Sequence, residues 1–149
     1  MIEVTKKLHH HGEPTPAPEF TVILDYEQRT KGRLKAKTTT GEELGLFLER
    51  GKVLRDGDIL ESSSGELIKV CAAEEELILA TCEDWLTFSR CCYHLGNRHV
   101  PIQVDALSLK MRPDYILEEM LVKLGMSTQK TLSSFDPEQG AYSGGHHHH

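Results

Sequence analysis

Short runs of alternating polar and apolar residues fill the first half of the chain. Leu34 and Ala36 alternate with basic residues, as they do on a strand that buries one face. Turn signals such as Asp56-Gly57 separate these runs, so the pattern is typical of short strands joined by tight turns. We therefore predict an all-β domain over residues 1–73. Its expected strands cover residues 2–5, 20–26, 33–37, 44–48, 59–60 and 67–70.

The pattern changes after residue 73. Trp85, Phe88, Ser89 and Cys92 recur with helical spacing, and this stripe predicts a helix over residues 84–95. The other predicted elements are strands over residues 77–81, 100–105, 107–112 and 128–135, and a helix over residues 115–124 between Asp114 and Gly125.

These later elements follow the order β-α-β-β-α-β, which is the split βαβ arrangement of ferredoxin-like domains. The predicted fold class is therefore α+β, with an all-β domain followed by a ferredoxin-like domain over residues 74–136. Glu74-Glu75-Glu76 is predicted to be a solvated link between the two domains. Residues 137–149 are predicted to form a flexible tail that ends in histidines.

Local signals set the ends of the first predicted helix. Asp84 is expected to accept hydrogen bonds from the first helical turn. Gly96-Asn97 is expected to end the helix, because Gly and Asn tolerate the left-handed conformation. His94 is then predicted in the last helical turn and His99 at the entry to a strand.

Composition and charge argue against several classes of protein. The formal charge of -6 and the pI of about 5.8 argue against a nucleic-acid-binding surface. No apolar run approaches the length of a membrane span, so no membrane partner is expected. The first residues lack the apolar core of a signal peptide, and the cytoplasm is the predicted location.

The four cysteines, Cys71, Cys82, Cys91 and Cys92, show neither a disulfide framework nor zinc-ribbon spacing. In a cytosolic protein they are expected to be buried or half-buried thiols. Cys91 and His94 lie three residues apart on the predicted helix, and this pair is a minor alternative for a shared metal site.

Histidines are the most informative candidate ligands, because neutral imidazole suits nickel, zinc and copper. His94 and His99 flank the predicted helix end, but two histidines do not make a closed site. His9-His10-His11 is predicted to be a surface loop, with metal binding as an alternative. The terminal run is either an affinity tag or a metal-collecting tail, and the sequence leaves both open. That run is His146, His147, His148 and His149.

Several motifs along the chain resemble one family. They are Tyr26-Glu27-Gln28-Arg29, Arg50-Gly51 with Asp56-Gly57-Asp58, Tyr93-His94-Leu95-Gly96-Asn97-Arg98-His99-Val100-Pro101, and Phe135-Asp136-Pro137-Glu138-Gln139-Gly140-Ala141-Tyr142. Together with the histidine tail, they make the chain similar to the UreE family of urease accessory proteins over nearly its whole length. The run from Gly96 to Pro101 is highly specific, whereas the tail alone is a weak signal.

The resemblance implies a homodimer joined through the second domains, in which His99 faces its twin across the two-fold axis and binds nickel. His94 is then assigned a structural role. Some family members carry a peripheral metal site at positions that are Pro113 and Tyr115 here, so that site is predicted to be absent. The axis duplicates His99, and tail histidines can complete the coordination sphere, which also accepts zinc or copper. The tail ligands are His146, His147, His148 and His149.

The first functional hypothesis is therefore a nickel metallochaperone and not an enzyme. It would deliver Ni(II) to the urease apoprotein complex, through the GTPase accessory protein of urease maturation. The alternatives are a metal-dependent hydrolase that uses His94, His99 and Asp114, and a peptide-binding adaptor with an incidental histidine tail. The hydrolase is disfavoured because the sequence has no HExxH-type pair and no base spaced to activate a metal-bound water.

Overall fold

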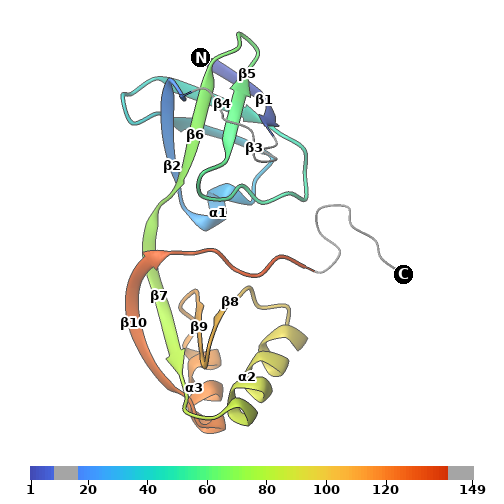
Figure 1. The fold of residues 1–149 in the computed structure, drawn as a ribbon, viewed down its shortest axis with the longest axis vertical. Coiled ribbons are helices and arrows are strands. Elements are labelled where there is room, and N and C mark those ends of the chain that lie inside the picture. Colours follow the sequence, from blue (N-terminus) through green and yellow to red (C-terminus); the bar gives the residue numbers. More distant parts are fainter. Residues whose placement is uncertain (9–16, 141–149) are drawn as a thin grey trace, which may run out of the picture. The chain divides into compact units, whose positions relative to one another are not determined.

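The computed structural model describes residues 1–8 and 17–140 of the chain (Figure 1). These residues divide into two compact units, Met1–Ala73 and Glu74–Gly140. Each unit has an apolar core of its own, with Val4, Leu46 and Ile68 at the centre of the first and Ile78, Leu95 and Met111 at the centre of the second.

The first unit is built on one six-stranded sheet. Its elements are β1 (Ile2–Leu8), β2 (Phe20–Leu24), α1 (Tyr26–Arg29), β3 (Arg33–Lys37), β4 (Glu43–Phe47), β5 (Ile59–Ser62) and β6 (Leu67–Ala72). The strand order is β2-β6-β5-β1-β4-β3, with parallel pairs β1–β4 and β2–β6 and antiparallel pairs elsewhere. The amide of Thr39 donates to the carbonyl of Thr21 (2.8 Å), so the two outer strands approach each other and the sheet is nearly closed. The mostly β character of this unit agrees with the prediction.

One predicted strand is too long. The sequence predicts a strand over residues 20–26, but β2 ends at Leu24 and a short helix begins at Tyr26. The cause is a capping box: Asp25 accepts from the Gln28 amide (2.8 Å), and the Gln28 side chain accepts from the Asp25 amide (3.0 Å). These two hydrogen bonds satisfy the backbone amides of Asp25 and Gln28 and start a helix there, although residues 20–26 are rich in β-forming residues.

Arg29, at the end of α1, is the largest buried polar side chain of the first unit, with only 1% of its surface exposed. Its guanidinium donates to the carbonyls of Leu24 (3.4 Å) and Leu54 (3.2 Å) and lies 5.7 Å from the centre of the Tyr26 ring. The Leu54 amide in turn donates to the Arg29 carbonyl (3.0 Å). Arg29 therefore fastens α1 to the loop that precedes β5.

The second unit has a four-stranded antiparallel sheet with two helices on one face (Figure 1). Its elements are β7 (Glu74–Thr81), α2 (Trp85–Asn97), β8 (Gln103–Asp105), β9 (Ser108–Met111), α3 (Tyr115–Leu124) and β10 (Ser127–Ser134). The strand order β10-β7-β9-β8 places the first strand of the unit beside the third and the fourth, as the split βαβ arrangement requires. The α+β fold class is confirmed.

Two further details differ from the prediction. Glu74-Glu75-Glu76 is not a link but the start of β7, because the long strand β10 pairs with these residues through Leu132, Ser133 and Ser134. The buried stripe of α2 consists of Phe88, Cys91 and Leu95, whereas Trp85 is 60% exposed. Trp85 lies edge to face against the buried Phe88, with ring centroids 5.8 Å apart, at the border of the core.

The starts of both helices agree with the prediction. Asp84 accepts from the Thr87 amide (2.9 Å), and this hydrogen bond holds the pKa of the exposed Asp84 carboxyl below its usual range. Asp114 accepts from the first-turn amides of α3, and α3 ends at Gly125 in the left-handed conformation, with φ of 113°. Within the described residues, no helix combines the length and apolar character needed to span a membrane.

Candidate metal centre

The end of α2 fixes the position of His99. The predicted stop at Gly96-Asn97 is wrong, because both residues are helical and the left-handed residue is His99, with φ of 56°. The His99 amide donates to the Gly96 carbonyl (3.0 Å), and the Val100 amide donates to the Leu95 carbonyl (3.1 Å). These two bonds form a Schellman motif, with His99 in the place that glycine usually takes. Val100 and Leu95 both pack in the core of the second unit, which supplies the apolar contact of the motif.

His99 is not at the entry to a strand, since β8 begins only at Gln103. The chain between them is held by the half-buried Val100 and the buried Ile102. The His99 side chain is exposed, so an imidazole on a firmly packed backbone faces solvent. It lines an open pocket of about 470 Å³, together with Val100, Pro101, Arg112, Pro113, Asp114 and Leu117.

His94 lies on the preceding turn of α2 and is half-buried. Its ring packs edge to face against Tyr93, with centroids 5.4 Å apart, and its carbonyl accepts from the Arg98 guanidinium (3.1 Å). Among the described residues that line the pocket of His99, His94 is absent. The structure therefore does not bring the two histidines into one pocket.

A complete ligand set does not form within the described part of one chain. Among residues 1–8 and 17–140, no three side chains of the types His, Cys, Asp and Glu come together to hold a metal ion. Cys91 is fully buried, and burial, with smaller contributions from the neighbouring Cys82 and Cys92 thiols, raises the pKa of its thiol. Metal binding by cysteine needs the thiolate, so this burial disfavours the predicted alternative of a Cys91–His94 pair.

The carboxylate beside His99 is already engaged. Asp114 Oδ1 accepts from the amides of Ile116 (3.0 Å) and Leu117 (3.2 Å), which caps α3. These bonds give the carboxylate a structural role at the start of α3 and do not support the general-base role that the hydrolase alternative requires.

Sequence comparison covers both units. The family model described as UreE urease accessory protein, N-terminal domain, matches residues 1–73, and the model for the C-terminal domain of the same protein matches residues 75–149. A urease accessory protein UreE of Marinomonas sp. (strain MWYL1) is 49% identical over 100% of both chains. The UreE of Pseudomonas fluorescens (strain Pf-5) is 45% identical over 95% of this chain and 86% of its own, and that of Marinobacter nauticus is 44% identical over 96% and 83%.

The chain belongs to the UreE family. The predicted resemblance is thereby confirmed. The named relatives are urease accessory proteins and not enzymes, which agrees with the prediction that the chain is not an enzyme and gives no support to the hydrolase alternative.

The residues that lead to the predicted tail are hydrogen-bonded to the segment after His99. The Glu138 amide donates to the Ile102 carbonyl (2.8 Å), and the Asp136 amide donates to the Gln103 side chain (3.0 Å). Ordered contacts thus continue two residues into the segment predicted to be a tail. The candidate ligands His146, His147, His148 and His149, and the run His9-His10-His11, lie outside the described residues.

Local sequence patterns do not identify the pocket residues that lie far from His99 in the sequence. Arg112 and Pro113 line its pocket, and Asp114 had been predicted only as a helix cap and as part of the hydrolase alternative. A signal was available: β9 must end close to the end of α2 if the sheet and helices share one core, and these residues follow β9 directly. The placement depends on tertiary packing, which local periodicity does not show.

Proposed function

We propose that the chain is a nickel metallochaperone, which takes Ni(II) as its cargo in the cytoplasm and delivers it for urease maturation. The expected partners are the urease GTPase accessory protein and the urease apoprotein complex. Family membership supports the connection to urease. The observation that carries the nickel proposal is His99: an exposed imidazole on a packed helix end, which belongs to no group of three candidate ligands among the described residues.

An incomplete ligand set suits a carrier. A single imidazole holds a divalent cation weakly, whereas a two-fold axis beside His99 supplies a second identical ligand. The resulting site stays partly open, so that ligands exchange one at a time when the cargo is passed on. A closed tetrahedral cage would retain the metal instead. Imidazole sites bind copper more tightly than nickel and also accept zinc, so metal supply and partner proteins must contribute to selectivity.

The surface beside His99 supports the proposed homodimer. Ile116 is 64% exposed on the first turn of α3, although it is a large apolar residue. It borders a second open pocket that meets the pocket of His99 at Leu117, and it lies there beside Arg98, Glu119 and Met120. This surface combines apolar area with both signs of charge, so it is suited to pairing with its own copy about an axis near His99.

The path of the chain after β10 supports a role for the tail. The bond between Glu138 and Ile102 holds the chain next to the segment that follows His99. His146 follows Glu138 by eight residues, which span at most roughly 28 Å when extended, so histidines from residue 146 onward can approach His99. The proposed ligands are His99 from both subunits with His146, His147, His148 or His149. Pro113 and Tyr115 carry no imidazole, so we propose no peripheral site there.

Dimerisation without metal is the first expected result. The metal-free chain should be a dimer at micromolar concentration, because packed surfaces and not nickel hold the subunits together. Ile116→Asp should produce folded monomers, whereas Val122→Asp, at another exposed position of α3 outside both pockets, should leave the dimer intact. Light scattering coupled to gel filtration measures the molar mass of both variants. A metal-free monomer of the unmodified chain would contradict the proposed assembly.

Delivery is tested by loading the full chain with one nickel per dimer and adding it to the apo-urease complex, with the GTPase and a chelator that removes free nickel. Urease activity should appear with the loaded chain and not with the same amount of free nickel. A loaded His99→Asn chain serves as the control and should not activate. Equal activation by free nickel under the chelator would overturn the proposal that this chain carries the cargo.

A further inference from the structure

The first unit concentrates positive charge on one side of its sheet. The side chains of β3 alternate, with Leu34 and Ala36 half-buried and the basic residues exposed. The turns on either side of the β3–β4 hairpin add two more exposed basic residues. We call this set the basic face: Lys31, Arg33, Lys35, Lys37 and Arg50.

The basic face has a defined geometry. The guanidinium of Arg33 lies 5.9 Å from the centre of the Phe47 ring, directly across the β3–β4 pair. A Cβ on Gly32 would lie 2.8 Å from the Leu48 carbonyl oxygen and 3.5 Å from Cγ of Arg50, so the absence of a side chain at Gly32 lets Arg50 lie close to β3. An open pocket of about 390 Å³ results. Its lining residues are Thr30, Lys31, Gly32, Arg33, Arg50 and Gly51, and none of them is acidic.

Apolar side chains lie beside these cations. Met1 is 63% exposed, and both Met1 and Phe47 lie over Gly45, within 3.1 Å of where its Cβ would be. A second open pocket of about 290 Å³ joins Met1 to Lys35 and Lys37, with Glu43 as its acidic member. The basic face is therefore bordered by exposed apolar surface.

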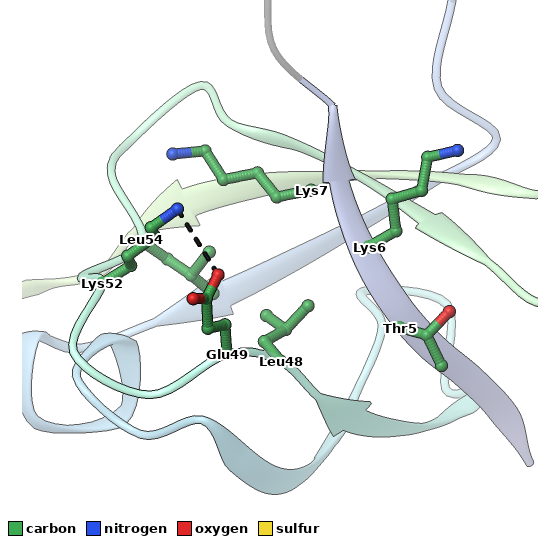
Figure 2. A pocket seen from close by; sticks show the side chains of 7 residues that line it. All are labelled: Thr5, Lys6, Lys7, Leu48, Glu49, Lys52 and Leu54. Atoms are coloured by element: carbon green, nitrogen blue, oxygen red, sulfur yellow. Dashed lines mark ion pairs between the residues drawn. The ribbon is translucent and has the colours of Figure 1, made fainter. Parts of the chain in front are cut away.

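The charges of the basic face are not neutralised within the part of the chain that the structure describes. None of its five residues has a carboxylate at ion-pairing distance there. The contrasting case is a pocket lined by three lysines, in which Figure 2 shows the ion pair between Lys52 and Glu49. Lys52 pairs with Glu49 (3.4 Å), and Lys6 and Lys7 pair with Glu61 (3.1 Å) and Asp58 (3.3 Å).

This arrangement is unusual for an acidic protein. Residues 1–73 contain eleven Lys and Arg against twelve Asp and Glu, so the unit as a whole is close to neutral. Five of the eleven cations nevertheless lie on β3 and in the turns that flank the β3–β4 hairpin. The net charge of -6 repels an acidic partner from most of the protein. Such a partner is attracted at the basic face, where the positive charges are concentrated.

We propose that the basic face binds an acidic segment of a partner protein, one in which carboxylates alternate with apolar side chains. Carboxylates pair with Arg33, Lys35 and Arg50, and apolar side chains contact Phe47 and Met1. The apolar border favours such a peptide over a phosphate group, which makes no use of it. The site lies in the first unit and is independent of nickel.

The test uses the full chain labelled with ¹⁵N and an eight-residue peptide of alternating Glu and Leu. The peptide should shift the amide signals of residues 31–37 and 47–51, and binding should weaken as salt is added. The triple variant Arg33→Gln, Lys35→Gln, Arg50→Gln should weaken binding by about tenfold or more. The matched triple Lys6→Gln, Lys7→Gln, Lys52→Gln removes the same charge from the pocket of Figure 2 and should change binding by less than about twofold.

Three outcomes would overturn the proposal. The first is equal weakening in both triple variants, which would attribute binding to net charge. The second is the absence of saturable shifts at residues 31–37. The third is saturable binding of inorganic tripolyphosphate at these residues without binding of the peptide, which would assign the face to phosphate. Melting curves of both variants establish that each is folded.

Discussion

Replacing His99 with asparagine should lower nickel affinity by about 100-fold or more in the chain truncated after Tyr142, because each substitution removes a ligand from both subunits of the proposed site. Asparagine is the suitable replacement. His99 has φ of 56°, and asparagine tolerates this left-handed conformation, so the Schellman motif is retained while the imidazole is lost. The melting temperature and the dimer should change little, since the side chain is exposed. Calorimetric titration with nickel measures the loss.

His94→Ala is the matched control, since it removes an imidazole that lies five residues before His99, on α2. This variant loses the ring contact with Tyr93 and should lower the free energy of unfolding by about 1 kcal/mol or less, with nickel affinity retained. If His94→Ala abolishes tight binding while His99→Asn leaves it intact, the assignment of the two histidines is wrong.

Arg29→Ala should destabilise the first unit by about 3 kcal/mol and lower its melting temperature by more than about 10 °C. The substitution removes two donors from the buried carbonyls of Leu24 and Leu54 and leaves a cavity beneath α1. Urea unfolding followed by amide NMR signals separates the two units. The second unit has its own core, so its free energy of unfolding should stay within about 0.5 kcal/mol of the original.

Arg33→Ala controls for the loss of an arginine, because Arg33 belongs to the same unit and is exposed. It should change the free energy of unfolding by no more than about 0.5 kcal/mol. Equal destabilisation by the two variants, or an unfolding midpoint of the first unit that does not respond to Arg29→Ala, would show that the buried guanidinium does not fasten α1 to the rest of the unit.

Where local chemistry determines an element, the sequence predicts it well. The helix over residues 115–124 has its bounds fixed by the Asp114 carboxylate and by Gly125, and both signals lie within a few residues of the helix. The order of elements in the second unit follows in the same way from periodicity and turns. The short helix α1 also had a local signal in the spacing of Asp25 and Gln28, but the β-forming composition of residues 20–26 concealed it.

The end of α2 shows why the conformation around His99 is not predictable from local sequence signals. Gly96-Asn97 carries the local signal for a stop, yet the helix continues to Asn97 and turns at His99. The turn occurs there because Leu95 and Val100 both pack in the core, and a Schellman motif centred on His99 is the closure that lets both do so. Tertiary packing therefore decides the conformation of the candidate ligand. Family resemblance, and not residue type, distinguishes His99 from His94 as the expected nickel ligand, since both residues are histidines.

The most direct test of the central claim is the stoichiometry of nickel on the chain truncated after Tyr142, which retains His99 and lacks the histidine run. A site shared across a two-fold axis should saturate at about one nickel per two chains. The same titration of the His99→Asn chain should show no tight phase. Saturation at one nickel per chain, or a tight phase that survives His99→Asn, would contradict a shared site at His99.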